Sequence, residues 1–152
     1  MSVKIREIDF KDLIFMLSIE NDKSIWKYGT NKSELSFDDA FDYIKQSKLM
    51  ILNNENQRFV IEYNNNKAGL IDLYDYQWHN SSAKVGIIVL KKFRGIGIGD
   101  KSLKLLIELC ENYLNINYLE SKVKESNEIS VRLFTSNNFK KISPENYVYK
   151  TT

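Results

Sequence analysis

The residues with the most distinctive chemistry form the run Arg94-Gly95-Ile96-Gly97-Ile98-Gly99-Asp100. Half of the six glycines of the chain alternate here, between an apolar strand pattern and a long helical pattern. Glycine permits positive φ and close approach of the main chain, so successive N–H groups can point at one ligand, and the start of a helix adds partial positive charge. The run therefore predicts a cradle for phosphate groups. A tight strand-to-helix turn without a ligand is the alternative interpretation.

Two other phosphate-binding motifs do not fit this run. The dinucleotide pattern G-x-G-x-x-G needs glycine at position 100 when it starts at Gly95, and at position 102 when it starts at Gly97. The chain has Asp100 and Ser102 there. The nucleoside-triphosphate loop also fails, because no glycine in the run is followed by lysine.

The run instead resembles the acetyl-CoA motif of the GCN5-related N-acetyltransferases, Gln/Arg-x-x-Gly-x-Gly/Ala, through Arg94, Gly97 and Gly99. The segments 127–134 and 138–139 are similar to the family's Asn-x-x-Ala/Ser-x-x-Leu-Tyr and Gly-Phe motifs. The motifs occur in the family's order, and the resemblance extends over nearly the whole chain. It implies one α/β (α+β) domain, with a central, mixed but mostly antiparallel sheet flanked by helices and with splayed central strands.

The resemblance further implies acetyl-CoA as co-substrate and no metal. The pantetheine arm would pair with exposed backbone of the strand that ends at Leu90, like an added strand, and Asn127 would hydrogen-bond to it. Transfer would be direct attack of a neutral amine on the thioester, so Cys110, at core spacing in the central helix, is expected to be structural. The residues implied to contact the co-substrate are Ile88, Val89, Leu90, Arg94, Gly95, Ile96, Gly97, Ile98, Gly99, Asp100, Asn127, Ser130, Leu133 and Phe134.

Two departures from the family affect the proton transfers. The family often has a tyrosine, the usual candidate for protonating the leaving thiolate, where this chain has Phe134. It also often has a glutamate, sometimes assigned as general base, where this chain has Lys84, and a lysine cannot replace it at neutral pH without a large depression of its pKa.

The candidates for the missing groups lie on a predicted neighbouring hairpin and, for one tyrosine, on the predicted strand 118–124. Glu62 and Asp72 are the catalytic candidates, with Asp75 as a further carboxylate that could accept the amine proton through a water. The candidates for the missing hydroxyl are Tyr74, Tyr76 and Tyr118.

The acceptor is expected to be a small-molecule amine that contacts Glu20, Trp26 and Tyr28, because aromatic rings beside carboxylates suit an ammonium group. Ordinary packing of a short helix is the alternative for these residues. Within the family, the segments 19–22 and 68–72 look most like those of bacterial spermidine and diamine acetyltransferases.

The spacing of apolar residues predicts the elements that hold these groups. The hydrophobic pattern also predicts that one helix buries Phe37, Ala40, Phe41 and Ile44. The predicted order is a strand from Val3, a helix capped by Asp9 and ending near Asn21, helices at 24–28 and from Ser36, a hairpin of 58–63 and 67–76, a central strand 83–90, a helix 99–114, a strand 118–124, a helix 127–137, and a hairpin of 140–143 and 146–150.

Composition limits the remaining possibilities. A chain of 152 residues has room for one domain, assigned to residues 1–152, and 22 basic against 20 acidic residues indicate neither nucleic-acid nor membrane binding. One cysteine and one histidine cannot form a Cys/His metal cluster. Without an apolar leader or a spanning segment we expect a cytoplasmic protein, and the excess of lysine over arginine suggests a bacterial source. A homodimer is left open.

Three functions follow as hypotheses. The first is acetyl transfer to the primary amine of a small molecule such as a polyamine. The second is the same chemistry on a nucleotide-linked amino sugar or a protein N-terminus. The third is a non-catalytic CoA-binding module, which the departures at Lys84 and Phe134 permit.

Overall fold

Seven strands form one sheet in the computed structural model, which describes residues 2–26, 33–47 and 56–151. The spatial order is β1-β2-β3-β4-β5-β7-β6, and every neighbouring pair is antiparallel except β4 and β5. The strands are β1 (Val3–Glu7), β2 (Gln57–Tyr63), β3 (Asn66–Gln77), β4 (Ser82–Val89), β5 (Tyr118–Lys122), β6 (Lys140–Ser143) and β7 (Asn146–Lys150).

The hairpin of β2 and β3 turns where the asparagine run predicts a turn. Asn64 and Asn65 have φ of 47° and 68°, the left-handed conformation that asparagine tolerates and that a two-residue hairpin turn requires. Tyr63 pairs with Asn66 across this turn, and Arg58 pairs with Asp72 further along. The turn, together with a register shift between Ile61 and Glu62, puts Arg58 beside Asp72.

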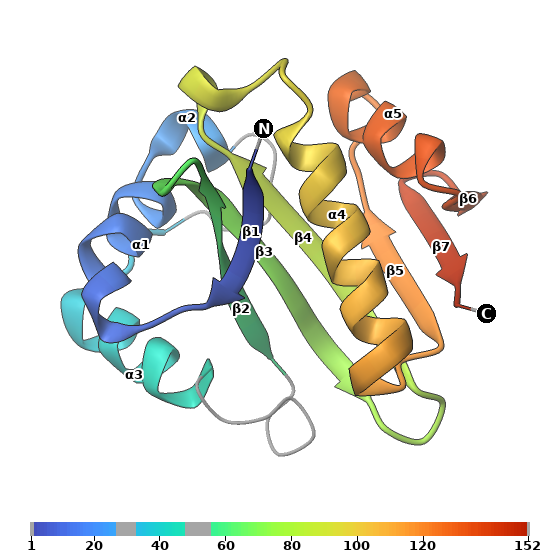
Figure 1. Ribbon diagram of the computed structural model, residues 1–152, viewed down its shortest axis with the longest axis horizontal. Coiled ribbons are helices and arrows are strands. Elements are labelled where there is room, and N and C mark those ends of the chain that lie inside the picture. The colour runs from blue at the N-terminus through green and yellow to red at the C-terminus, as the bar shows by residue number, and fades with distance from the viewer. Residues whose placement is uncertain (1, 27–32, 48–55, 152) are drawn as a thin grey trace.

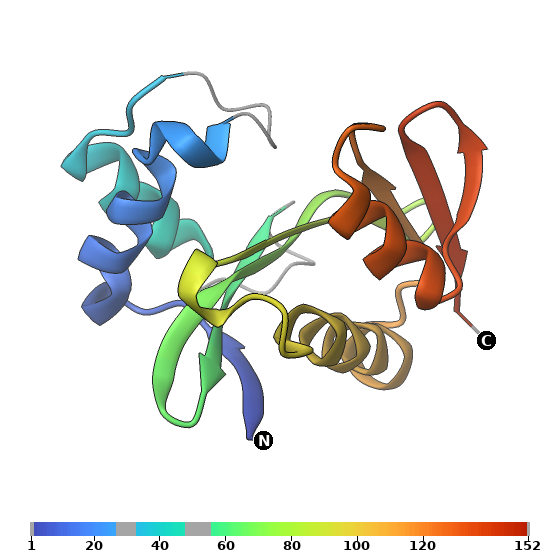
Figure 2. The same ribbon diagram turned by 90° about the horizontal axis from the view of Figure 1, so that it is seen from above.

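Helices cover both faces of the sheet (Figures 1 and 2). One face carries η1 (Phe10–Asp12), α1 (Leu13–Glu20), α2 (Lys23–Trp26) and α3 (Phe37–Ser47). The other carries α4 (Ile98–Leu109), which continues into a π-helical turn η4 (Cys110–Leu114), while η3 (Lys91–Phe93) links β4 to α4 and α5 (Glu128–Ser136) follows β5. This is the mixed, mostly antiparallel sheet with flanking helices that the sequence predicts.

Side chains of β2 and β3 point alternately to the two faces of the sheet, so the core is divided into two clusters. Val60 and Leu70 pack under α1 and α3 with Met16 and Ile44, whereas Phe59 and Ile61 belong to the cluster under α4. Side chains of successive residues in a strand point to opposite faces, so both faces of these central strands are buried. The second cluster also takes in Leu103, Leu106, Cys110, Leu119, Phe134 and Phe139.

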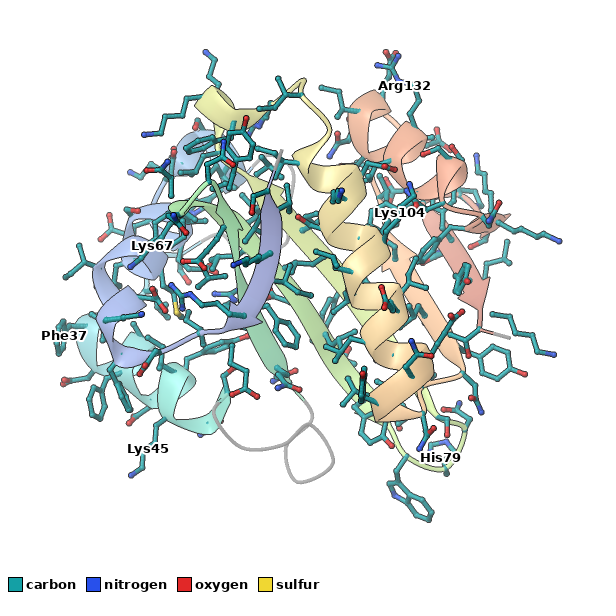
Figure 3. The ribbon with its side chains drawn as sticks, in the orientation of Figure 1. Phe37, Lys45, Lys67, His79, Lys104 and Arg132 are labelled. Carbon is teal, nitrogen blue, oxygen red and sulfur yellow. The ribbon has the colours of Figure 1, made fainter. Side chains whose placement is uncertain are left out.

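The prediction for α3 is wrong in two of its four positions. Ala40 and Ile44 are fully buried, but Phe37 is 59% and Phe41 43% exposed. Figure 3 shows Phe37 on the outer side of this helix. The helix packs on α1 through a narrow stripe, and the Phe41 ring lies beside that stripe, stacked on Phe10 with ring centroids 4.8 Å apart.

The other predicted elements are confirmed with small shifts of their ends. The predicted helix of 24–28 is described as far as Trp26, and Tyr28 lies outside the described residues. In the described ranges, no helix has the length and apolar character needed to cross a membrane.

Candidate functional site

The site lies where β4 and β5 separate. The two strands pair in parallel only from Ser82 and Tyr118 to Lys84 and Glu120, and beyond that point they diverge (Figure 1). The divergence opens a cavity of about 380 Å³ between the second half of β4 and residues 121–124. This confirms the splayed central strands that the family resemblance implies.

A second cavity, of about 300 Å³, continues from the first toward the glycine loop. Ile87, Ile88, Asn127 and Ser130 line both cavities, as does Ile25 of α2. A ligand in the second cavity can therefore present its end to a ligand in the first. That is the arrangement required for direct transfer of a group between two molecules.

The backbone of the glycine loop explains two of its glycines. Gly95 and Gly97 have φ of 82° and 89°, in the region that side chains disfavour, and Gly97 is the N-cap of α4. Gly99 lies inside the first turn of α4, where a Cβ atom would stand 3.7 Å from side-chain carbons of Leu133 and Val89, at ordinary contact distance. The helix start and the two left-handed residues have the backbone geometry that the predicted phosphate cradle requires.

The polar side chains around the loop are held by the protein. The Arg94 Nε donates to the carbonyl of Val89 at 2.7 Å, and the Asp100 carboxylate accepts from Lys104 at 2.6 Å and from Asn137 at 2.9 Å. These hydrogen bonds lower the pKa of Asp100. The side-chain oxygen of Asn127 accepts from the Ser130 N–H and caps α5.

Most of the residues expected to contact the co-substrate lie around these cavities. Leu90 and Ile96 do not line either one: Leu90 donates its N–H to Ala68 in the sheet, and Ile96 is half exposed. Phe134 lines the first cavity but not the second. The expected residues that line the second cavity are Ile88, Val89, Arg94, Gly95, Gly97, Ile98, Gly99, Asp100, Asn127, Ser130 and Leu133.

An ion-pair cluster lies against the first cavity, which Glu20, Trp26 and Asp72 line. Arg58 reaches Glu20 Oε1 with Nη1 at 2.8 Å and binds both oxygens of Asp72, at 2.7 Å and 2.8 Å. Burial alone would lower the pKa of Arg58, but the two carboxylates raise it well above its ordinary value. The two carboxylates and the one guanidinium together give this wall of the cavity a net charge of one negative unit.

Arg58 is not among the residues that the sequence predicts for the site, because no sequence pattern indicates its role. A lone arginine in a strand is most often a surface residue, and this one is 7% exposed because its partners come from α1 and β3. The Tyr43 ring covers its guanidinium, with 4.8 Å from the Arg58 Cζ to the ring centroid.

The two catalytic candidates are not equivalent. Asp72 lines the first cavity, although Arg58 engages both of its oxygens. Glu62 lines neither cavity and instead lies 3.2 Å from Arg6 on β1, so its position gives no support to a catalytic role.

The three tyrosines that are candidates for the missing hydroxyl also lie in different places. Tyr74 lines the first cavity, Tyr76 packs against the cluster under α4, and Tyr118 stands outside both cavities beside Lys150. Lys84 lines neither cavity and lies 3.3 Å from Asp75 at the surface. His79 is at the tip between β3 and β4, at one end of the molecule (Figure 3).

Cys110 is fully buried in the cluster under α4 and lines neither cavity. Burial raises the pKa of its thiol to about 12. Among the described residues no group of three or more His, Cys, Asp and Glu side chains is placed to hold a metal ion.

Comparison with known proteins agrees with this geometry. The acetyltransferase (GNAT) domain family matches residues 3–140. The spermidine N(1)-acetyltransferase of Escherichia coli K12 is 26% identical over 133 residues, which are 88% of this chain and 70% of that protein.

Solved structures show the same fold. Spermidine N-acetyltransferase from Vibrio cholerae, in complex with CoA and spermine, superposes with a TM-score of 0.86 at 21% identity and covers 98% of this chain and 95% of that one. A ribosomal L7/L12 alpha-N-protein acetyltransferase in complex with coenzyme A has a TM-score of 0.83 at 16% identity, over 99% and 94% of the two chains.

The splayed sheet, the glycine-rich helix start and the two joined cavities agree with the fold of these acetyltransferases. The chain belongs to the acetyltransferase (GNAT) domain family. It is an N-acetyltransferase that uses acetyl-CoA as co-substrate.

Proposed function

We propose that this enzyme transfers the acetyl group of acetyl-CoA to a primary amine of a polyamine such as spermidine. The observation that carries the proposal is the negatively charged wall of the first cavity, where Glu20 and Asp72 share a single buried Arg58. The Trp26 ring lies beside it, held by a hydrogen bond of 2.7 Å from its indole N–H to the Glu20 carbonyl. Excess carboxylate beside an aromatic ring suits a ligand with several ammonium groups.

In this proposal the chain's own residues divide the work between the cavities. The loop from Gly95 to Asp100 holds the pyrophosphate with backbone N–H groups, and the unpaired edge of β4 holds the pantetheine arm. Glu20 and Asp72 bind the distal ammonium groups of the acceptor, and the reacting amine lies in the first cavity beside β4, near Gly86. The co-substrate supplies the activated thioester.

An acceptor panel with acetyl-CoA and detection of the released thiol tests the proposal. We expect release with spermidine and spermine well above release with amino-sugar nucleotides or peptide N-termini. Preference for either of the latter would move the assignment to that acceptor. Binding of CoA without thiol release on any amine would instead favour the non-catalytic module.

A variant pair sharpens this test. Glu20→Gln should raise the KM for spermidine about tenfold, the loss of one charge-assisted contact of about 1.4 kcal/mol, and leave the KM for acetyl-CoA unchanged. Glu108→Gln removes a carboxylate from the exposed side of α4 and should change neither constant.

The source and assembly of the protein are parts of the same proposal. We propose a bacterial, cytoplasmic enzyme, supported by the bacterial origin of its relatives. A homodimer is the assembly to test first, and sedimentation would distinguish it from larger forms such as the dodecamer described for the Vibrio cholerae spermidine N-acetyltransferase.

A further inference from the structure

The two proton transfers of the reaction lack groups at the usual positions of the family. Phe134 has no hydroxyl, is 2% exposed, and packs edge-on against Phe139 with ring centroids 5.0 Å apart. Lys84 has no carboxylate. A proton donor for the leaving thiolate must therefore come from another wall of the cavity.

Tyr74 lies on that other wall. It lines the first cavity from β3, directly across from Lys84 in the strand register and two residues from Asp72, so it shares the cavity face of the sheet with Asp72. The residue diagonal to it on β4 is Gly86, and a Cβ atom there would already stand 3.7 Å from the Tyr74 Cε1. The missing side chain at Gly86 leaves the space beside β4 that the Tyr74 ring uses.

The charged groups around Tyr74 come from three strands. Asp72 and Asp75 belong to β3, Lys84 to β4, and Glu120, which pairs with Lys84, to β5. Burial raises the pKa of Tyr74, the three carboxylates raise it further, and Lys84 opposes them. Tyr74 is therefore protonated at neutral pH and can donate, while Lys84 is the cation that stabilises its anion.

We propose that Tyr74 is the catalytic proton donor of this enzyme and that Lys84 acts through it as a positioning residue. The inference rests on the proposed acetyl transfer. As the amine nitrogen forms its bond to the carbonyl carbon, the carbon–sulfur bond breaks and the thiolate takes the Tyr74 proton. The tyrosinate, beside the Lys84 ammonium, then recovers a proton from the acetylated nitrogen through water. The net result is an amide, a thiol and an unchanged enzyme.

This assignment gives both departures from the family one explanation. A buried phenolate needs a neighbouring cation, and a glutamate at position 84 would oppose it. With lysine at position 84, the Tyr74 hydroxyl on β3 can donate the proton in place of a hydroxyl on α5. The residue at position 134 can then be phenylalanine. Within the described part of the chain the Tyr74 hydroxyl has no hydrogen-bond partner, which leaves it available to a ligand in the cavity.

Steady-state kinetics with Tyr74→Phe test the donor. We expect kcat to fall about 10²-fold or more, within the usual range for a general acid, with little change in the KM for acetyl-CoA. Tyr118→Phe is the matched control, since it removes a hydroxyl beside a lysine outside both cavities, and it should stay within about twofold of the parent. Calorimetry with CoA, expected to be unchanged in both variants, shows that each is folded.

Lys84 is tested by titration. In the absence of acetyl-CoA, the ultraviolet difference between the parent and Tyr74→Phe follows the ionisation of Tyr74 alone. Lys84→Gln should move this ionisation to higher pH and lower kcat, and Lys84→Arg should restore both, because it returns the positive charge.

The outcomes separate the two proposals. Failure of the polyamine assignment appears in the parent, as turnover with other amines or none, and the titration of Tyr74 still reports on Lys84. The present inference is overturned if Tyr74→Phe keeps kcat within threefold of Tyr118→Phe, or if Lys84→Gln leaves the titration unchanged. It is also overturned if Tyr74→Phe loses activity only in step with CoA binding.

Discussion

Gly69 of β3 and Ile88 of β4 approach so closely that no side chain fits between them. A Cβ atom on Gly69 would stand 3.0 Å from the carbonyl carbon of Ile88 and nearer still to its oxygen. The neighbour is backbone, so it cannot turn aside as a side chain would. Ile88 lines both cavities, which means that the fit between these two residues helps to set the shape of the active site.

Gly69→Ala should therefore destabilise the fold and disturb the site together. We expect a loss of about 1–3 kcal/mol in the free energy of unfolding, the usual range for overpacking, and weaker CoA binding. Gly86→Ala is the control for stability, because its Cβ would meet only the Tyr74 ring at 3.7 Å. Denaturant unfolding of the two variants measures their losses in the free energy of unfolding. Equal losses would refute the argument.

Gly97→Val should abolish CoA binding. Gly97 has φ of 89° at the start of α4, where a β-branched side chain is strained and crowds the phosphate cradle. Gly95→Ala is the comparison, because it has similar φ but nothing within 4 Å of its Cβ, so it should weaken binding less. If calorimetry shows Gly97→Val binding CoA as tightly as the parent, the cradle assignment is wrong.

Cys110→Ala should keep kcat within a few-fold of the parent and lose about 1 kcal/mol of stability by removal of a small buried side chain. Since burial raises the pKa of the thiol to about 12, the folded protein should also react slowly with thiol reagents at neutral pH. Loss of all turnover in a folded Cys110→Ala protein would instead indicate a covalent acyl-enzyme.

Phe134→Tyr should change kcat little in the parent, because Tyr74 already supplies the proton. In the Tyr74→Phe background the same substitution should restore part of the lost kcat, since Phe134 lines the same cavity. Kinetics of the two single variants and the double variant measure this coupling. A large gain from Phe134→Tyr in the parent would mean that no other group acts as the acid.

The buried ion pairs of Asp12 should make the stability of the fold sensitive to acid. These ion pairs do not involve the active site. Its carboxylate is fully buried and binds Arg6 at 2.8 Å and Lys67 at 2.7 Å. Burial alone would raise the pKa of Asp12, but these cations and the Asp9 N–H lower it well below its usual range. A carboxylate with a lowered pKa stabilises the fold above its unfolded pKa of about 3.9 and loses this contribution as the pH falls toward its folded value.

Asp12→Asn should therefore lose about 3–5 kcal/mol at neutral pH, the usual cost of breaking a buried ion pair, and show a flatter stability profile below pH of about 4. Glu108→Gln, at an exposed position, should follow the parent profile. Urea unfolding across the acid range provides the measurement. Parallel profiles for parent and Asp12→Asn would show that this ion pair does not carry the acid response.

The sequence could predict the elements and the backbone of the glycine loop because both depend on local signals. Asn64 and Asn65 mark a turn by their backbone preference alone, and the positive φ of Gly95 and Gly97 follows from residue type and position. The predicted start of a helix at Asn127 is equally local, because an N-cap needs only its own helix. Sequence and structure agree at these positions for the same physical reason.

The ion-pair cluster around Arg58 on the acceptor side could not be predicted in the same way. Arg58, Glu20 and Asp72 are far apart in the chain and meet only through the register of β2 and β3 and the placement of α1. Phe37, the first residue of α3, is also exposed although helical periodicity places it with the buried Ala40 and Ile44.

The separation of β4 from β5 also has a consequence for solubility. From Val85 to Val89 the side of β4 that faces β5 pairs with no strand of the described residues, so an edge strand lies in the middle of the sheet. Edge strands with apolar sequences are templates on which other chains can add, and Val85-Gly86-Ile87-Ile88-Val89 has no charge to prevent it. An occupant of the cleft covers that edge. The same molecule that brings the acetyl group should therefore protect the enzyme against aggregation, and preparations stored without CoA should aggregate first.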